Sequence, residues 1–237
     1  NGWDKGEKIS IETGKVENMT SFEEFFDAYK KQQEYNISLL VNADNAIDVA
    51  HATRCPLPFL SCMVDDCIKR GKTVQEGGAV YNFTGPQGFG IANMADSLYA
   101  IRKLAFDEKK VTLGEWKRAL AMNYGEGLDA ISAAEIVTQI VKEMEEKGMT
   151  PGEAEIAEML RTVMTTELPE EEKKRYQEIR AMIEEVPKFG NDNEEVDYFA
   201  REVAYTYTRP LLKYHNPRGG QFQAGLYPVS ANVPLGA

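Results

Sequence analysis

The sequence has few cysteines, no long apolar run and no excess of positive charge, and each shortage excludes a class of protein. Three cysteines in 237 residues cannot build the disulfide framework of a small secreted domain. No apolar run approaches the roughly 20 residues that a membrane-spanning helix needs. A formal net charge of −11 argues against nucleic acid or an anionic membrane as the main partner. We therefore predict a cytoplasmic protein that binds neither nucleic acid nor membrane.

Hydrophobic residues make up 43% of the chain, which is too many for a disordered protein and enough for a sizeable core. The sequence opens at Asn1, and no signal-peptide pattern follows. Residues 1–6 have the composition of a turn, and residues 219–237 are strand-like and lack a polar tail. Complete domains usually end in frayed or solvated stretches. We expect the chain to be an internal segment of a longer protein.

Helix signals dominate the sequence. Four Ser/Thr-x-x-Glu capping boxes, which begin at Ser21, Thr112, Ser132 and Thr150, stand before apolar residues with helical spacing. Proline and glycine mark several helix ends. The predicted helices include 21–40, 43–53, 59–70, 93–106 and 196–207.

Strand signals are few and stand beside glycine-rich turns. One short buried strand is predicted at 79–83 and another segment with strand alternation at 221–229. Many helices and few strands predict part of an α/β fold, with the other parallel strands of its sheet elsewhere.

Metal binding and cysteine chemistry have weak support. His51, Cys55, Cys62 and Cys67 lack the tight paired spacing of structural zinc sites, and Cys62 and Cys67 would lie on roughly opposite faces of one helix. We interpret the cysteines as small buried hydrophobic residues. A Cys–His nucleophile that pairs one of them with His51 or His215 stays open, although no such pairing is evident from sequence.

A glycine-rich loop at 85–90 precedes the helix predicted to start near Asn93. Its spacing matches neither dinucleotide-binding nor P-loop motifs. A tight loop that lets two backbones approach closely is favoured over a phosphate-binding loop.

Alternation along 221–229 puts Gln221, Gln223, Gly225, Tyr227 and Val229 on one face. Amides, a glycine and a tyrosine suit the inside of a barrel that holds a small polar ligand. A solvent-exposed edge strand explains the same pattern, and alternation alone does not choose between the two.

Several motifs resemble those of one enzyme family, in the same order over nearly the whole chain. The sequence is similar to the glycyl radical enzymes, the pyruvate formate-lyase-like superfamily. The motifs are Ile11–Gly14, Pro58–Ser61, Asp65–Ile68, Gly71–Asn82, Ala95–Lys103, Lys188–Asp192 with Val196-Asp197, and Ser230–Gly236.

The resemblance implies a ten-stranded α/β barrel built from two five-stranded halves. Residues 1–237 would be an internal, mostly helical segment of that barrel domain. The stretch 130–187 looks like a helical insertion that many members lack.

In this family one loop carries a cysteine that becomes a thiyl radical and another carries the glycyl radical. An activating enzyme that uses S-adenosylmethionine and an iron–sulfur cluster installs the radical. The sequence contains neither the Gly-Cys-Val-Glu nor the Gly-Tyr context of these loops. The resemblance therefore implies no catalytic residue and no bound cofactor or metal in this segment, which alone would be inactive.

The resemblance also implies that Gln223, Tyr227 and Val229 line the substrate cavity, with Arg218 at the start of their strand. Gln223 in place of a strong cation speaks mildly against a sulfonate substrate. It suits a small neutral polar or aromatic substrate.

The implied function is radical cleavage of a C–C or C–heteroatom bond in anaerobic metabolism by a lyase, dehydratase, decarboxylase or formate acetyltransferase. The implied partners are the activating enzyme, the small-molecule substrate and a second copy in a homodimer. A non-catalytic helical structural or interaction module derived from the family is the alternative.

Overall fold

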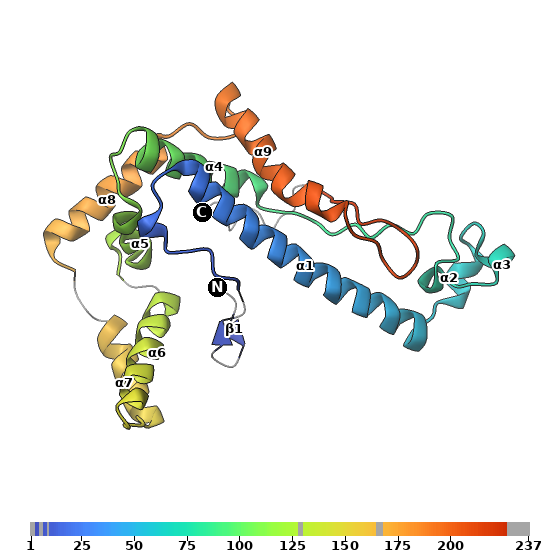
Figure 1. Cartoon of the computed structure of the whole chain (residues 1–237), viewed down its shortest axis with the longest axis horizontal. Helices are drawn as coiled ribbons and strands as arrows, with labels where there is room; N and C mark the ends of the chain where they lie inside the picture. The colour runs from blue at the N-terminus through green and yellow to red at the C-terminus, as the bar shows by residue number, and fades with distance from the viewer. Residues whose placement is uncertain (1–2, 5–6, 9, 128–129, 165–167, 227–237) are drawn as a thin grey trace. The chain divides into compact units, whose positions relative to one another are not determined.

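The computed structural model describes residues 3–4, 7–8, 10–127, 130–164 and 168–226 (Figure 1). These residues are mostly helical, as predicted. The chain divides into two compact units. The first comprises residues 1–15, 19–99 and 187–237, and the second comprises 16–18 and 100–186.

Helix α1 (Phe22–Arg54) of the first unit spans 33 residues. It begins where the capping box predicts, because the Ser21 hydroxyl accepts a hydrogen bond from the amide of Glu24 (3.2 Å). The sequence predicted two helices with a break near residue 41. That stretch contains neither glycine nor proline, so the helix continues through the buried Val41. It ends just before Pro56, which cannot continue a helix.

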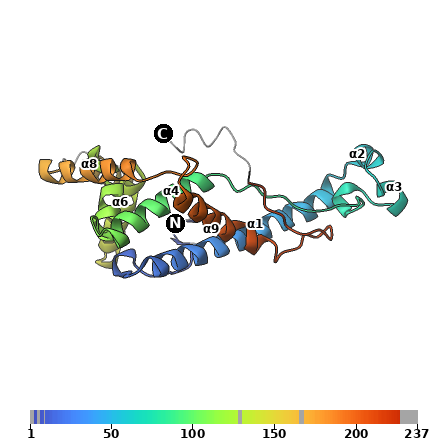
Figure 2. The same ribbon diagram turned by 90° about the horizontal axis from the view of Figure 1, so that it is seen from above.

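Helix α9 (Glu194–Leu211) runs alongside α1 in the same direction (Figure 1 and Figure 2). Near their N-terminal halves, the ring of Phe199 lies 5.7 Å from the rings of Phe22 and Phe26. Farther along, a second hydrophobic cluster buries residues of both helices and of the segment that follows α9. Its members are Ile37, Val41, Tyr207, Leu211 and Phe222.

The helix predicted at 59–70 is in fact two short helices, α2 (Pro58–Cys62) and α3 (Cys67–Arg70). Asp66 has a left-handed backbone conformation with φ of 71°, which interrupts helical hydrogen bonding between them. Gly71, with φ of 62°, ends α3 as predicted.

The strand predicted at 79–83 is wrong. The side-chain amide of Asn82 donates to the carbonyls of Gly77 (3.3 Å) and Ala79 (2.9 Å), and such local bonds bend the backbone into a turn. Tyr81 is 83% exposed rather than buried. The 3-10 helix η2 (Val74–Glu76) precedes this turn.

Strand pairing among the described residues is limited. Strands β1 (Trp3–Asp4) and β2 (Glu7–Lys8) form one antiparallel pair, and isolated bridges link loops elsewhere in the first unit. The ten-stranded barrel stays a prediction.

Helix α4 (Ile91–Ile101) starts directly after Gly90 and continues into a π-helical segment, η3 (Arg102–Asp107). The predicted helix 93–106 corresponds to both. Tyr99 of α4 is buried and its ring lies 6.0 Å from that of Phe199. This contact joins α4 to the aromatic cluster of α1 and α9.

The second unit contains α5 (Leu113–Ala121), η4 (Asn123–Gly125) and α8 (Glu170–Glu185), which pack together. The capping box predicted at Thr112 is present and starts α5. The 3-10 helix η1 (Val16–Asn18) also belongs to this unit. The buried hydrophobic residues of α5 and α8 are Trp116, Ala119, Tyr176 and Ile179.

Helices α6 (Ala130–Glu146) and α7 (Glu153–Met164) of the second unit pack against each other as a hairpin. Ser132 lies inside α6 rather than at its start, and α7 begins at Glu153 rather than beside Thr150. The stretch 130–187 thus contains α6, α7 and α8, and its origin as an insertion stays a prediction. None of the helices in the described parts is long and apolar enough to cross a membrane.

Candidate functional site

Two loop segments of the first unit, residues 82–88 and 214–226, lie side by side and carry the predicted substrate residue Gln223. We call them the paired segments. The amide of Gln223 donates to the carbonyl of Thr84 (2.9 Å). Parallel bridges join Thr84 with Phe222 and Gln87 with Gly225.

The predicted alternation along 221–229 holds at residues 222 and 223, whereas Leu226, which it places on the same face as Phe222, is 44% exposed. Phe222 is 0% exposed in the cluster between α1 and α9, whereas the side chain of the next residue, Gln223, is exposed. The backbone hydrogen bond of Gln223 therefore fixes a residue whose amide side chain is directed away from the core.

Asn216 holds the start of this arrangement and is only 6% exposed. Its Nδ2 donates to the carbonyl of Asn82 (2.5 Å) and to the Thr84 hydroxyl (2.8 Å). Its Oδ1 accepts from the amides of Arg218 (3.1 Å) and Gly220 (2.9 Å). Both polar atoms of a buried amide are thus satisfied, which burial requires.

Arg218 links the paired segments to α1. Its Nε donates to the carboxylate of Asp48 at 2.9 Å, and the two side chains are 18% and 20% exposed. Its guanidinium also donates to the hydroxyl of Thr84 (3.0 Å). Arg218 therefore anchors the start of the 221–226 stretch, as the resemblance implies.

Two glycines permit the close approach. A Cβ on Gly220 would collide with the carbonyl of Asn82, and one on Gly225 would collide with the side-chain amide of Gln87. At Gly220 the two backbones are too close for any side chain, whereas at Gly225 the Gln87 side chain would have to move.

Acidic and phenolic groups lie near this network. Burial, and then the charge of Asp48, raise the pKa of Asp44 above its ordinary value. Burial, and then the charge of Asp44, raise the pKa of Tyr207. The buried Tyr207 hydroxyl has no hydrogen-bond partner within the described residues. At neutral pH these directions leave the tyrosine neutral.

A groove of about 440 Å³ opens beside the paired segments, in the size range of small-molecule sites. One wall is formed by residues 88–92 and the other by one face of α9 and by Leu226, which directly precedes Tyr227. Its lining is mostly apolar, with Asp197 and Arg201 as charged exceptions. Such a lining can enclose a small molecule, but it supplies few groups for proton transfer.

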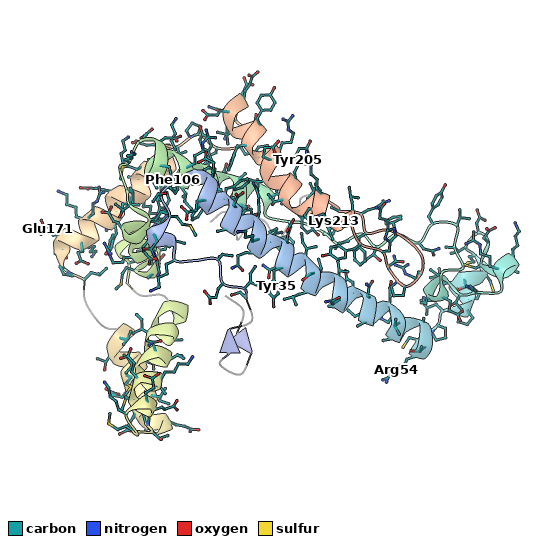
Figure 3. The ribbon with its side chains drawn as sticks, in the orientation of Figure 1. Tyr35, Arg54, Phe106, Glu171, Tyr205 and Lys213 are labelled. Atoms are coloured by element: carbon teal, nitrogen blue, oxygen red, sulfur yellow. The ribbon has the colours of Figure 1, made fainter. Side chains whose placement is uncertain are left out.

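A smaller groove of about 280 Å³ lies between α1 and α9. Tyr205 of α9 and Lys213, which follows the end of α9, line it and are labelled in Figure 3. The ammonium of Lys213 lies 3.5 Å from the carboxylate of Glu34, and the guanidinium of Arg209 lies 3.8 Å from the Tyr205 ring. The charged side chains of Lys213 and Arg209 already have partners within the protein. This groove is therefore the weaker candidate for a substrate site.

The prediction that the cysteines are buried hydrophobic residues is confirmed for one of the three. Cys67 is buried, whereas Cys55 and Cys62 are exposed because they lie at the ends of α1 and α2. Cys62 and Cys67 also lie on two helices rather than on one. Across the described ranges, no group of three or more His, Cys, Asp or Glu side chains is placed to hold a metal ion.

The glycine-rich loop at 85–90 behaves as the tight loop that the sequence favours. The amide of Gly88 donates to the carbonyl of Gly225 (2.8 Å). A Cβ on Gly88 would come within 2.6 Å of two carbons of the Tyr207 ring. The loop therefore uses its glycines to pack against the chain itself.

Of the three predicted substrate residues, Gln223 lies on the paired segments, whereas Tyr227 and Val229 lie outside the described residues. Sequence reasoning missed Asn216, Thr84 and Asp48. The Asn-Pro and Gly-Gly pairs at 216–220 are turn signals that could have drawn attention to Asn216.

Residues 1–236 match a protein family described as "Pyruvate formate lyase-like". A trans-4-hydroxy-L-proline dehydratase of Clostridioides difficile is 29% identical over the full chain, which covers 24% of that protein.

Two solved structures are more similar. The chain of a structure described as 1,2-propanediol dehydration in Roseburia inulinivorans is 64% identical, with a TM-score of 0.91, over all of this chain and 28% of that one. The glycerol-bound B12-independent glycerol dehydratase of Clostridium butyricum is 43% identical, with a TM-score of 0.72, over 99% of this chain and 24% of that one.

The chain thus spans about a quarter of the length of these relatives. The family match extends over both units and over the paired segments. The chain belongs to the pyruvate formate lyase-like family, and its structural neighbours are glycyl radical enzymes.

Proposed function

We propose that these residues are one section of a B12-independent glycyl radical dehydratase that acts on a small vicinal diol such as 1,2-propanediol. The reaction is a redox-neutral loss of water. One C–O bond breaks, the hydroxyl leaves as water with a hydrogen of the diol, and the other hydroxyl-bearing carbon becomes a carbonyl carbon. From 1,2-propanediol the product is propanal.

The observation that carries this proposal is the 64% identity, at a TM-score of 0.91, to the structure described as 1,2-propanediol dehydration. The glycerol dehydratase follows at 43%, and the hydroxyproline dehydratase at 29%. Similarity thus falls as the named substrate departs from a simple diol, which supports the diol over an imino acid.

The side chain chemistry of Gln223 agrees with a neutral substrate. A carboxamide both donates and accepts hydrogen bonds and carries no charge, so it suits a hydroxyl better than it suits a sulfonate or carboxylate. We propose that Gln223, Tyr227 and Val229 contribute to substrate selection from this section of the enzyme.

The remaining parts of the proposal concern the whole protein. The glycyl radical and the thiyl cysteine come from regions other than these 237 residues, and an S-adenosylmethionine iron–sulfur activating enzyme installs the radical. The full-length protein is a cytoplasmic homodimer of anaerobic metabolism, and this section alone is inactive. The alternative, a non-catalytic module, gains no support from relatives that are named as enzymes.

The test uses the full-length protein, activated without oxygen by its activating enzyme. Electron paramagnetic resonance measures the glycyl radical, and product analysis then compares 1,2-propanediol, glycerol and trans-4-hydroxy-L-proline. We expect a radical signal and the highest kcat/KM for a diol. A radical-bearing enzyme that prefers hydroxyproline, or that turns over neither diol, contradicts the proposal.

A variant pair tests the assignment of Gln223. Gln223→Ala should raise the KM for the diol, whereas Gln177→Ala, on the exposed face of α8, should leave it unchanged. Equal behaviour of the two variants, with full radical yield in both, removes Gln223 from the substrate site.

A further inference from the structure

Asp48, Thr84, Asn216 and Arg218 form a connected set of polar side chains at one end of the paired segments, and we call this set the polar lock. Asn216 and Arg218 each donate to the Thr84 hydroxyl, at 2.8 and 3.0 Å. Arg218 also donates to Asp48 of α1 at 2.9 Å. The lock therefore ties three elements that are distant in sequence.

The ladder between the paired segments specifies its own register weakly. The stretch 221–226 contains one residue, Phe222, that is 0% exposed, and a glycine at 225 that has no side chain to place. Short strands that contain glycine and have little apolar alternation are prone to slip along their partners. Further interactions are needed to hold the paired segments in a single register.

The polar lock supplies these interactions. Asn216 is almost fully buried, and the four hydrogen bonds of its side chain go to atoms of residues 82–84 and 218–220. Sliding one segment by a residue would break the bonds to Asn82 and Thr84 inside the protein, where unpaired polar groups are costly. Such a slip would also bring Gly220 out of its contact with the Asn82 carbonyl.

Register decides which side chain of this segment is exposed. Phe222 is buried and Gln223 is exposed, and a slip by one residue exchanges the two faces of a strand. Gln223 would then turn toward the core, and Ala224 or Phe222 would take its place.

We propose that Asn216 and Arg218 are positioning residues for substrate selection. They do not touch the substrate; they hold the stretch 221–226 in the one register that exposes Gln223. This inference rests on the proposed diol dehydratase function for its substrate, but the lock itself can be measured without turnover.

The first measurement is hydrogen exchange of the full-length protein, read by mass spectrometry on peptides that cover 221–226. The amides of Gln223 and Gly225 donate to Thr84 and Pro86 in the ladder. We expect Arg218→Gln and Asn216→Ala to accelerate exchange there by about tenfold or more. Arg180→Gln, which removes an arginine paired with Glu126 and Glu184 in the second unit, is the control and should leave 221–226 unchanged.

The second measurement is substrate preference in the activated enzyme. We expect Arg218→Gln to change the ratio of kcat/KM for 1,2-propanediol and glycerol by about 10- to 100-fold, because small misplacements near a substrate have effects of this size. Arg218→Lys keeps the charge but not the fork of donors, so it should restore part of the ratio. A purely structural loss would lower the radical yield and slow both diols equally.

Each outcome decides between the alternatives. Unchanged exchange at 221–226 in both variants overturns the lock. Faster exchange with an unchanged substrate ratio in a radical-bearing enzyme overturns the positioning role. If Asn216→Ala does not fold, Arg218→Gln and Thr84→Val, which removes the shared hydroxyl, give the same two readouts. A wild-type enzyme that bears a radical but dehydrates no diol contradicts the proposed function, and the exchange measurement still confirms or overturns the lock.

Discussion

Glu115, in the first turn of α5, accepts hydrogen bonds from two residues. Its carboxylate accepts hydrogen bonds from Arg175 (Nε to Oε1, 2.7 Å) and from the amide of Thr112 (3.4 Å). The hydrogen bond from Arg175 is the largest cause that lowers the pKa of Glu115 below its ordinary value of 4.5, and partial burial opposes this shift. A carboxyl whose pKa is lowered by folding stabilises the protein above the unfolded-state pKa, and this contribution disappears as pH falls through the folded-state pKa.

We therefore expect Glu115→Gln to lower the free energy of unfolding of the second unit by about 1 kcal/mol at neutral pH. The difference from wild type should shrink as pH falls below the ordinary value of 4.5, and it should disappear once the pH has fallen through the lowered folded-state pKa, where the Glu115 carboxyl is protonated. Urea unfolding of the 237-residue chain, followed by the fluorescence of Trp116 in a Trp3→Phe background, measures this loss.

Glu178→Gln is the matched control, since Glu178 lies 3.7 Å from the same arginine and is 52% exposed. Its effect should stay below about 0.3 kcal/mol. If Glu178→Gln lowers the free energy of unfolding as much as Glu115→Gln does, the hydrogen bond between Arg175 and Glu115 stabilises the unit no more than the longer ion pair with Glu178.

Residues with local partners were predictable from the sequence, and residues with distant partners were not. Ser21 and Thr112 each bond an amide three residues ahead, so spacing alone identified both helix starts. Asn216 meets Thr84 across 132 residues, and Arg218 meets Asp48 across 170. No periodicity contains that information, and only the family resemblance pointed to Arg218.

At the scale of elements, the packing of α9 on α1 includes a residue that belongs to neither helix. Phe222 is fully buried in their shared cluster, although it lies on a loop segment. We expect Phe222→Ala to destabilise the packing of α9 on α1 by about 3–5 kcal/mol, the usual loss for a buried phenylalanine. Hydrogen exchange of the α9 amides in the full-length protein measures the change.

Phe83→Ala provides the comparison for this variant, because Phe83 lies on the neighbouring segment but is 55% exposed. It should change protection of α9 by less than about 1 kcal/mol. Similar losses in the two variants would indicate that Phe222 does not contribute more than an exposed aromatic ring.

Element types were predicted better than element limits. Apolar spacing identified the helices within α1, α4 and α9, since each buries one face. The break at Asp66 was missed because an aspartate rarely adopts a left-handed conformation, and nothing in its neighbours announces it. The strand expected at 79–83 failed because the Asn82 side chain competes for the carbonyls of this stretch.

At the scale of the whole molecule, the hairpin of α6 and α7 buries its own apolar residues, such as Ala133 and Val137. We therefore expect a full-length protein in which 130–164 is replaced by a short Gly-Ser linker to keep its glycyl radical yield and its KM for the diol. Electron paramagnetic resonance and steady-state kinetics test this. Deletion of α5 (113–121), which contains the buried Trp116, should abolish both. If the hairpin deletion also loses the radical, the enzyme needs residues 130–164, which contradicts the prediction that 130–187 is an insertion.

The pairing of Thr84 with Asn216 and Phe222 has a consequence for biosynthesis. At a synthesis rate of roughly 5–20 residues per second, the ribosome needs on the order of ten seconds to make the 132 residues that separate Thr84 from Asn216. During that time the carbonyls of 82–86 have no neighbour from 221–226 to accept from, and Phe222 does not yet exist to fill the space between the long helices. Closure of this part of the molecule must therefore come late, and it brings the stretch 221–226 into place only after most of the surrounding helices have been translated.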